Sequence, residues 1–271
     1  MFLFLVVISL LLIDGAVCEL DEEDDDTQFA LLYLRHYHYL SPETSSNTNT
    51  TEAIENFQKF FGLTVTGELD DDTMYEMKKP RCGDPDVDTD GLRLKRYATV
   101  GRQWSNTTLT YSFSPGADMK NKDQLRIIAR AFKYWSDAAP KLTFTRTNNF
   151  NKSDIRISFG KLTHSGVPGE RQCPYDFDGQ GGVIAHAYYP TEGRIHFDDD
   201  EHYTEFGGSV VGWWWNKRQT RGLLYTAVHE IGHALGLKHS DVKDAVMWPL
   251  AKNGNPKLDQ DDIDGIISLY G

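Results

Sequence analysis

The chain has 271 residues and a formal net charge of −12 at pH 7. The acidic excess lies entirely in residues 1–96, which contain 8 Lys and Arg against 20 Asp and Glu, whereas residues 97–271 contain 20 of each. No basic region is present, so the composition excludes a nucleic-acid-binding protein. The length and the 39% of hydrophobic residues are those of one large or two modest globular domains.

The N-terminus has the pattern of a secretory signal. Residues 2–13 form an apolar run too short to span a bilayer, and the small residues of Ala16-Val17-Cys18 suit signal peptidase. We predict that residues 1–18 are removed; a membrane anchor is the alternative. No later stretch approaches 18 apolar residues, so we expect a secreted product without a membrane anchor. Three sequons fit an exported glycoprotein: Asn49, Asn106 and Asn151.

Residues 19–96 are predicted to form a small helical domain. The acidic residues 19–26 are expected to be a solvated tail. Apolar side chains at helical spacing predict helices over residues 28–39, 52–61 and 70–79. The aromatic side chains of these helices are assigned to a core, which leaves the domain without chemistry of its own.

A cysteine and a basic tetrapeptide lie at the C-terminal end of this region. Cys82 lies among turn-forming residues in a segment expected to be extended. Further on, Arg93-Leu94-Lys95-Arg96 has the form R-x-K-R, which predicts cleavage between Arg96 and Tyr97 by a furin-like convertase. Basic residues in a linker are also often merely solvated. After signal removal the other cysteine is Cys173, so a disulfide between the two is an alternative.

Residues 97–271 are predicted to form an α+β domain. Short runs rich in β-branched and aromatic residues predict strands over residues 109–113, 142–147, 154–159, 183–189 and 194–198. Helical periodicity predicts helices over residues 122–138, 223–235 and 260–269.

The chemistry of this domain is concentrated in the segment HEIGHALGLKH. On a helix, His229 and His233 lie one turn apart on the same face, so both imidazoles can bind one zinc ion. Gly236 can take the positive φ that ends the helix, which lets the chain bring His239 to the same ion. Three histidines leave one coordination position open, and Glu230 can act as general base toward a zinc-bound water that attacks a carbonyl.

The extended zinc motif, followed by Met247 in the segment AVMWP, resembles the metzincin proteases, in which a methionine lies under the metal. A bare H-E-x-x-H occurs by chance in many helices, but the longer spacing is much more specific. The segments FQKFFGL, VTGELD, PRCGDPD and YATVG resemble the matrix metalloproteinases, or matrixins. The resemblance implies a helical prodomain followed by a metzincin catalytic domain with a twisted mixed five-stranded sheet and three helices.

The resemblance also implies a latch, meaning a prosegment loop that blocks the catalytic site. In matrixin zymogens the prosegment cysteine is the fourth zinc ligand and silences the enzyme, which implies this role for Cys82. An ion pair between Arg81 and Asp86 would hold the loop. Asp84 stands where a valine is usual, and an acid beside a thiolate is expected to weaken the latch.

Further metal sites are implied by the resemblance. His164, His186 and His196 fall where the family binds a structural zinc, but Gly166 stands where the aspartate ligand is usual. The candidates for the fourth ligand are Cys173, which the spacing to Phe177 favours, Asp176 and Glu170. The implied calcium ligands are Asp178, Gly179, Gly181, Val183, Asp198 and Glu201. Without metals, these residues would be ordinary core histidines and a solvated acidic turn.

The resemblance implies that substrate specificity is determined around the predicted helix 223–235, which carries the first two histidines of the zinc motif. Tyr225, four residues before the first zinc histidine, would make the S1′ pocket shallow and favour residues such as leucine, with Pro249 opposite. An edge strand of the sheet would pair with an extended peptide. By analogy, Asp261 of the last helix would pair with the amino group of Tyr97 after activation.

We therefore expect a secreted, monomeric endopeptidase with zinc and calcium, made as a zymogen. Its expected partners are extended segments of extracellular matrix or pericellular proteins, a furin-like convertase and protein inhibitors of the tissue-inhibitor type. The chain ends where such catalytic domains end, so no hemopexin-like propeller and no unwinding of triple-helical collagen are expected. The alternatives are a metzincin with a narrow processing role and a non-enzymatic zinc protein, but the latter would lack Glu230 or a zinc histidine.

Overall fold

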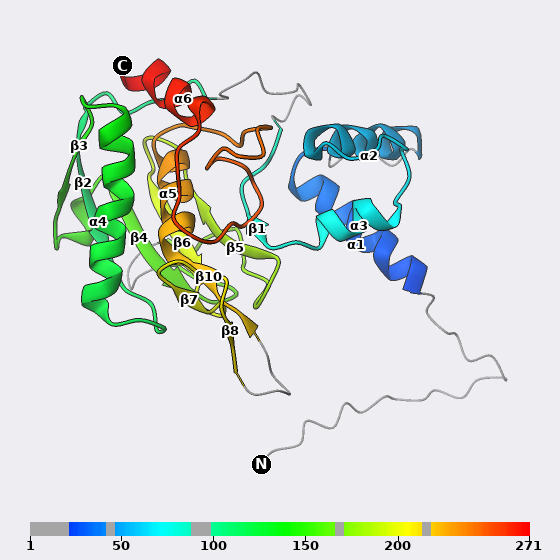
Figure 1. Cartoon of the computed structure of the whole chain (residues 1–271), viewed down its shortest axis with the longest axis horizontal. Coiled ribbons are helices and arrows are strands. Elements are labelled where there is room, and N and C mark those ends of the chain that lie inside the picture. The colour runs from blue at the N-terminus through cyan, green and yellow to red at the C-terminus, as the bar shows by residue number, and fades with distance from the viewer. Residues whose placement is uncertain (1–21, 42–46, 88–98, 166–170, 213–217) are drawn as a thin grey trace, which may run out of the picture.

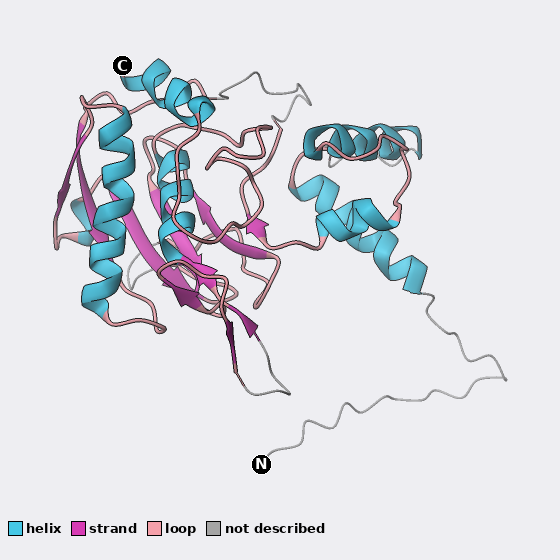
Figure 2. Ribbon diagram, in the orientation of Figure 1, coloured by secondary structure: helices cyan, strands magenta, loops and turns pink. Residues whose placement is uncertain are grey.

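The computed structural model describes residues 22–41, 47–87, 99–165, 171–212 and 218–271. Its elements form an N-terminal group of helices and a larger part made of a sheet and helices (Figure 1, Figure 2). The predicted signal peptide and the predicted cleavage site at Arg96 and Tyr97 lie outside the described residues. Among the helices of the described segments, none has the length and apolar character that crossing a bilayer requires.

The N-terminal part consists of α1 (Glu22–His36), α2 (Asn47–Phe61) and α3 (Asp71–Met77), which confirms the three predicted helices. α3 begins after Asp70, whose carboxylate caps it by accepting a hydrogen bond from Thr73 N at 2.8 Å. α1 begins inside the acidic segment that we expected to be a tail. Acidic residues are favourable in the first turn of a helix, which explains this earlier start.

The larger part contains a mixed sheet (Figure 2). Its strand order is β1-β5-β6-β4-β2-β3. β5 runs antiparallel to β6, and the other neighbouring strands are parallel. The strands are β1 (Arg81–Cys82), β2 (Thr108–Phe113), β3 (Thr143–Arg146), β4 (Ile155–Gly160), β5 (Val183–Ala187) and β6 (Arg194–Asp198). β2 to β6 confirm the predicted five-stranded mixed sheet, and β1 adds a sixth strand at its edge.

β1 joins the sheet because β5 would otherwise be an edge strand with free backbone groups. The segment 80–83 lies in a channel between β5 on one side and the loop 249–251 on the other. Four backbone hydrogen bonds of 2.8 to 3.0 Å hold it there: Arg81 N to Gly182 O, Gly83 N to Ala185 O, Cys82 N to Pro249 O, and Ala251 N to Pro80 O.

The predicted helices of the larger part are α4 (Asn121–Ala138), α5 (Leu223–Ala234) and α6 (Gln260–Tyr270). α4 and α5 pack together on one face of the sheet (Figure 1). The fully buried Trp135 of α4 donates from its indole N–H to Val228 O of α5 at 2.9 Å. α6 begins with a capping box, in which Asp259 and Asp262 exchange side-chain-to-backbone hydrogen bonds.

The structure also contains short elements that the sequence does not predict. They pair as two small sheets, β10 with β7 and β8 with β9, and one turn of 3₁₀ helix precedes β4. Elements of two or three residues are too short to have a detectable hydrophobic period. Their bounds are β7 (Tyr203–Thr204), β8 (Val210–Val211), β9 (Arg218–Gln219), β10 (Arg221–Gly222) and η1 (Phe150–Lys152).

The two parts share a hydrophobic core. Trp248 and Leu250, next to and within the loop 249–251, are 3% and 9% exposed and belong to the cluster formed by the N-terminal helices. The Trp248 ring stacks on Phe60 with 5.9 Å between ring centres and meets Phe61 edge-on at 5.2 Å. The larger part therefore completes the core of the N-terminal helices.

Trp248→Ala is expected to loosen this contact, because removing a large buried aromatic side chain costs about 3–5 kcal/mol. Cys82 is 3% exposed in the segment that joins the two parts, so its alkylation by iodoacetamide in the full chain should accelerate at least about tenfold. Tyr75→Ala, which removes an aromatic ring that is 67% exposed on α3, is the matched control and should leave the rate unchanged. Equal rates for wild type and Trp248→Ala would contradict the shared core.

Candidate functional site

The histidines of the zinc motif are positioned by α5 and by the turn that ends it. His229 and His233 lie on the helix, and Gly236 follows with a φ of +108°. A Cβ atom on Gly236 would lie 2.6 Å from Arg102 O, so this turn requires glycine. The predicted helix end is confirmed, and the chain beyond it places His239 beside the first two histidines.

Each of the three imidazoles is oriented by a hydrogen bond at Nδ1. The partners are Val246 O for His229 at 2.7 Å, Leu237 O for His233 at 2.8 Å and Asp86 Oδ1 for His239 at 2.8 Å. The Nε2 atoms are therefore left to converge, and those of His229 and His233 are 3.1 Å apart. Burial, with a smaller effect of His239, lowers the pKa of His229 to about 3, so its imidazole is neutral, as metal binding requires.

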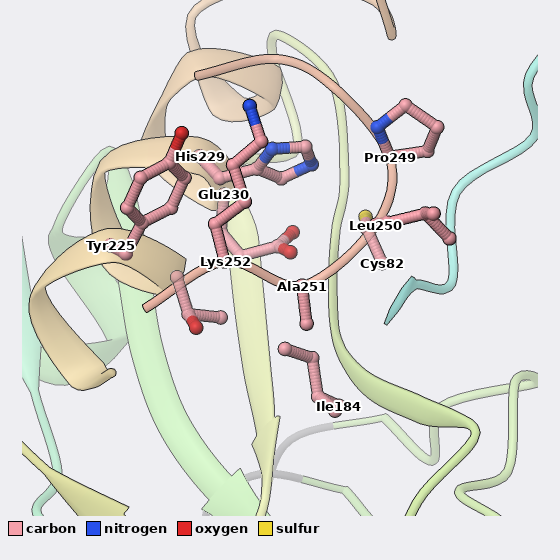
Figure 3. Close-up of a pocket in the computed structure, with 10 residues that line it drawn as sticks. Cys82, Ile184, Tyr225, His229, Glu230, Pro249, Leu250, Ala251 and Lys252 are labelled. Carbon is pink, nitrogen blue, oxygen red and sulfur yellow. The ribbon is translucent and has the colours of Figure 1, made fainter. Parts of the chain in front are cut away.

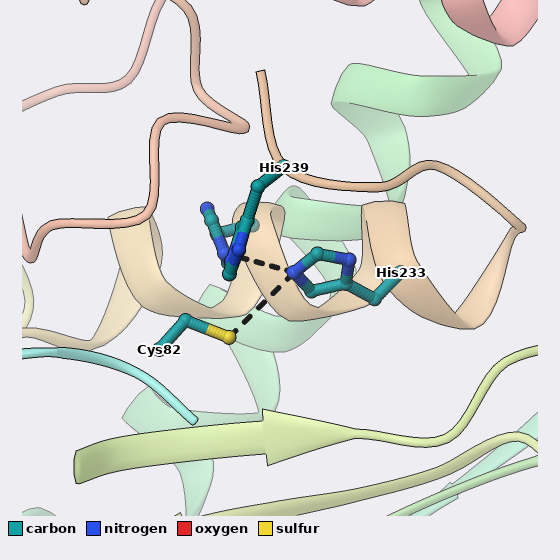
Figure 4. A group of neighbouring side chains, drawn as sticks. Cys82, His233 and His239 are labelled. Atoms are coloured by element: carbon teal, nitrogen blue, oxygen red, sulfur yellow. Dashed lines mark hydrogen bonds between the residues drawn. The ribbon is translucent and has the colours of Figure 1, made fainter. Parts of the chain in front are cut away.

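Cys82 of β1 completes this group (Figure 4). Its Sγ lies 3.6 Å from His233 Nε2, and the ligand atoms of the cysteine and the three histidines all lie within 4.8 Å of one another. Burial, followed by the nearby Glu230 and Asp84, raises the pKa of the thiol well above its usual value. Within the described part of the chain, His239 Nε2 has no hydrogen-bond partner. Three imidazoles and a sulfur, all buried, are a donor set that fits a tetrahedral zinc ion.

A buried carboxylate connects the Cys82 segment to the third histidine. Asp86 Oδ1 accepts a hydrogen bond from Arg81 Nη2 at 2.5 Å and contacts His239 Nδ1, while Oδ2 accepts one from Tyr39 OH at 2.9 Å. Burial alone would raise the pKa of Asp86, but Arg81 and His239 lower it to about 2. The predicted ion pair is confirmed, with Arg81 1% and Asp86 0% exposed. The sequence does not predict the link to His239.

Glu230 and Asp84 lie on the same side of this group. Their ligand atoms and those of Cys82 and His233 all lie within 4.8 Å of one another. Burial, together with Asp84, raises the pKa of Glu230 well above its usual value, and burial raises the pKa of Asp84 to about 8. Within the described residues, Glu230 Oε2 has no hydrogen-bond partner. The carboxyl of Glu230 therefore faces the point where the imidazoles converge.

Met247 lies directly against α5. A Cβ atom on Gly232 would lie 2.4 Å from Met247 Sδ and 2.9 Å from Trp135 Cζ2, so the methionine approaches the helix only because residue 232 is glycine. Asp262 of α6 fixes the turn by accepting hydrogen bonds from Val246 N at 2.8 Å and Met247 N at 3.0 Å. The methionine turn is thus held between α5 and α6.

A small pocket opens beside Glu230 (Figure 3). Its free space is about 10 Å³, room for about one water. Tyr225 and Pro249, the two residues expected at the S1′ pocket, both line it. Lys252 lines it as well, 5.9 Å from the Tyr225 ring, and donates to Ala245 O at 3.0 Å. The sequence does not point to Lys252, because a lysine in a loop carries no pattern.

A second buried group combines His164, His186 and His196 with Cys173, and all four ligand atoms lie within 4.8 Å of one another. His196 Nδ1 lies 3.0 Å from His164 Nε2 and 3.1 Å from His186 Nε2, and Cys173 Sγ lies 3.3 Å from His186 Nε2. Burial and His164 lower the pKa of His196 to about 3. This donor set also fits zinc.

The candidates for the fourth ligand of this second group are separated by the structure. Cys173 lies within the group, whereas Asp176 is exposed and does not belong to it. Glu170 lies outside the described residues. Cys82 and Cys173 are both free and belong to separate groups, so the alternative disulfide is wrong.

The expected calcium ligands lie around a glycine-rich turn and β6. Asp178 accepts hydrogen bonds from Val183 N at 3.1 and 3.2 Å, and Glu201 accepts one from Gly181 N at 2.6 Å. Asp198 is buried, and burial raises its pKa to about 7. Glu201 also forms an ion pair with Arg221 at 3.0 Å, which supplies one cation to this acidic group. Gly179 has a positive φ of +85° in the same turn.

Asp261 lies at the start of α6, as predicted. It accepts a hydrogen bond from Ser240 Oγ at 2.6 Å. Its expected partner, the amino group of Tyr97, lies outside the described residues.

Comparison with known families agrees with this geometry. The family model described as Matrixin matches residues 103–271, and a model of a peptidoglycan-binding domain matches residues 24–77. The chain therefore falls in a class of zinc-dependent metalloendopeptidases. It belongs to the matrixin family.

Three curated relatives illustrate the extent of the similarity. The chain is 38% identical to the hatching enzyme of Paracentrotus lividus over 267 residues, which cover 96% of this chain and 41% of that protein. It is 39% identical to the interstitial collagenase of Bos taurus, covering 95% and 51%. It is 34% identical to metalloendoproteinase 1 of Glycine max, covering 88% and 80%. The chain thus spans about half the length of the first two relatives.

Gly232→Ala is expected to destabilise the protein even though alanine is about 1 kcal/mol better than glycine within a helix. The added methyl group would meet Met247 and Trp135, and such overpacking costs about 1–3 kcal/mol. Urea denaturation of the zinc-loaded chain should therefore give a lower free energy of unfolding. Ser268→Ala on the exposed side of α6 is the control, with a change of at most about 0.5 kcal/mol. A more stable Gly232→Ala variant would show that Met247 does not press on the helix.

Proposed function

We propose that this protein is the zymogen of a secreted zinc endopeptidase whose own Pro80–Gly83 segment blocks the active site. One observation carries the proposal. Three imidazole Nε2 atoms and the Cys82 sulfur converge next to Glu230, within a channel that residues 80–83 fill. The proposed domain boundaries follow: a signal peptide over residues 1–18, a propeptide over 19–96 and a catalytic domain over 97–271.

In the proposed reaction, His229, His233 and His239 hold the catalytic zinc. When bound, zinc supplies a Lewis acid that polarises the scissile carbonyl and lowers the pKa of water. Glu230 takes the proton from the attacking water and returns it to the leaving amine as general acid. Its buried position beside the imidazoles, with an Oε2 that has no partner among the described residues, supports this role. The Nδ1 hydrogen bonds keep the three imidazoles facing the same point.

Substrate is proposed to occupy the channel after the propeptide leaves. Departure of residues 80–83 frees hydrogen-bonding groups on both walls, and such groups bind an extended peptide main chain by strand addition. The freed groups are Gly182 O, Ala185 O, Pro249 O and Ala251 N. The latch and the substrate would then compete for the same backbone atoms as well as for the metal.

The pocket beside Glu230 is proposed as the S1′ site. Tyr225 and Lys252 on its wall support a shallow pocket with a preference for residues of medium size such as leucine. We propose extracellular matrix or pericellular proteins as substrates. Protein inhibitors of the tissue-inhibitor type would bind the same channel.

Activation is proposed to occur by cleavage after Arg96 by a furin-like convertase. The R-x-K-R sequence supports this step. The amino group of Tyr97 created by the cut would pair with Asp261.

A second zinc ion is proposed to be structural, with His164, His186, His196 and Cys173 as ligands. The closed set of four buried ligands supports this role, because a structural site leaves no position open. Calcium is proposed at the glycine-rich turn, where Asp178, Asp198 and Glu201 supply the hard oxygen ligands that calcium prefers. The backbone carbonyls of Gly179, Gly181 and Val183 would complete that site.

Glu230→Ala is expected to reduce kcat/KM for a fluorogenic peptide with leucine at P1′ by at least about 10²-fold, because it removes the general base. Both forms are cut after Arg96, and zinc content is measured in parallel. Asp137→Ala, at an exposed acid on α4, is the matched control and should retain full activity. Wild-type activity that a zinc chelator does not abolish, or a Glu230→Ala variant as active as wild type, would overturn the mechanism.

Cys173→Ser is expected to lower the zinc content from about two ions per chain to about one, because a hydroxyl is a poor replacement for a thiolate. Metal analysis after dialysis against a mild chelator measures the loss. Cys173→Asp supplies a carboxylate, itself a zinc ligand, and should recover the second ion. If wild type, Cys173→Ser and Cys173→Asp hold equal zinc, Cys173 is not a ligand.

A further inference from the structure

Asp84 lies in the latch loop with its carboxyl group aimed at the metal site. The residue is 8% exposed, and its backbone N–H donates to Cys82 Sγ at 3.4 Å. A hydrogen bond from the backbone of Ala187 holds the carboxyl group. Oδ2 lies 3.6 Å from His233 Nε2, the atom proposed to bind zinc, and has no hydrogen-bond partner within the described residues.

The surroundings of this carboxylate favour a bound cation. Burying a carboxylate oxygen without a partner is unfavourable, and its neighbours Glu230 and Cys82 would repel it if ionised. The nearby cation Arg81 is engaged elsewhere, since its guanidinium donates to Asp86, to the Tyr33 hydroxyl and to Cys82 O. A zinc ion at the convergence point of the imidazoles would offer Asp84 a partner once the sulfur is gone, because carboxylate oxygen is a zinc ligand.

We propose that Asp84 is a second metal-directed group of the latch, which binds the catalytic zinc when the Cys82 sulfur is removed or modified. The inference rests on the proposed zinc site and on the proposed zymogen. It reverses the expectation that an acid at this position weakens the latch. Cys82 and Asp84 are two residues apart on one loop, so loss of the thiol leaves a replacement ligand in place. Opening this zymogen then requires removal of the whole segment.

The test uses the full chain with Arg93→Ala and Arg96→Ala, so that the propeptide stays attached. Four forms are compared: no further change, Cys82→Ser, Asp84→Val, and Cys82→Ser with Asp84→Val. Gel electrophoresis verifies an intact propeptide, and thermal unfolding verifies the fold. Cleavage of the fluorogenic peptide is one readout. The absorption spectrum of the cobalt-substituted protein is the other, because the d–d bands report the ligands directly.

The Cys82→Ser form is expected to stay latent, at least about tenfold less active than the double variant. The double variant still has residues 80–83 in the channel and should remain less active than the convertase-cut enzyme. The cobalt spectrum of the Cys82→Ser form should lose the part of the thiolate charge-transfer intensity that Cys82 contributes, while the Cys173 site keeps its own band, and it should change again when Asp84→Val is added. Asp84→Asn with Cys82→Ser keeps the side-chain volume and should behave like the valine variant. Asp72→Val with Cys82→Ser, at an exposed acid of α3, is the control and should stay latent.

Equal activity and identical cobalt spectra for Cys82→Ser with and without Asp84→Val would overturn the role of Asp84. Failure of the proposed function has a different signature, namely a convertase-cut wild type that holds zinc but cleaves no peptide. In that case the cobalt spectra of the uncut forms still decide whether Asp84 contacts the metal. A double variant that stays latent with an unchanged cobalt spectrum also counts against the inference.

Discussion

The arrangement of the site depends on one buried carboxylate. Asp86 is fully buried and contacts the Arg81 guanidinium, the Tyr39 hydroxyl and the His239 imidazole at once. Through these contacts Asp86 fixes together the position of the N-terminal part, the position of β1 and the orientation of the third histidine. Removing one partner of such a buried pair typically costs about 3–5 kcal/mol, since the other charge stays desolvated. The proposed metal site and the docking of the N-terminal helices are therefore a single structural unit.

The segment 80–83 contacts the larger part in two different ways. Its backbone fills a strand position beside β5, and its Cys82 side chain reaches the histidines of α5. Backbone pairing is independent of side-chain identity, whereas the sulfur contact is specific to one atom. A substrate would have to replace both contacts. The proposed inactivity of the zymogen therefore depends on the geometry of the proposed substrate channel.

Much of this architecture could be predicted from local sequence. The periodicity of helices such as α4 and the spacing of His229, His233 and His239 are local signals, and the structure has the helix and brings the histidines together. The link from Asp86 to His239 spans 153 residues, and Trp248 packs into a core formed by distant helices. Such contacts depend on tertiary docking, which no local pattern reports. The placement of Cys173 with the histidines is intermediate, because spacing suggested it and only the fold separates it from Asp176.

The position of Trp248 has a consequence for the fate of the proposed propeptide. A helical unit of this size has a small core and little stability to spare. Part of its core, Trp248 and Leu250, belongs to the other side of the proposed cut. A propeptide that dissociates leaves those two side chains behind, and its own Phe60 and Phe61 then face water. The dissociated propeptide would therefore lose the folded shape that rebinding needs. Its release would then be irreversible.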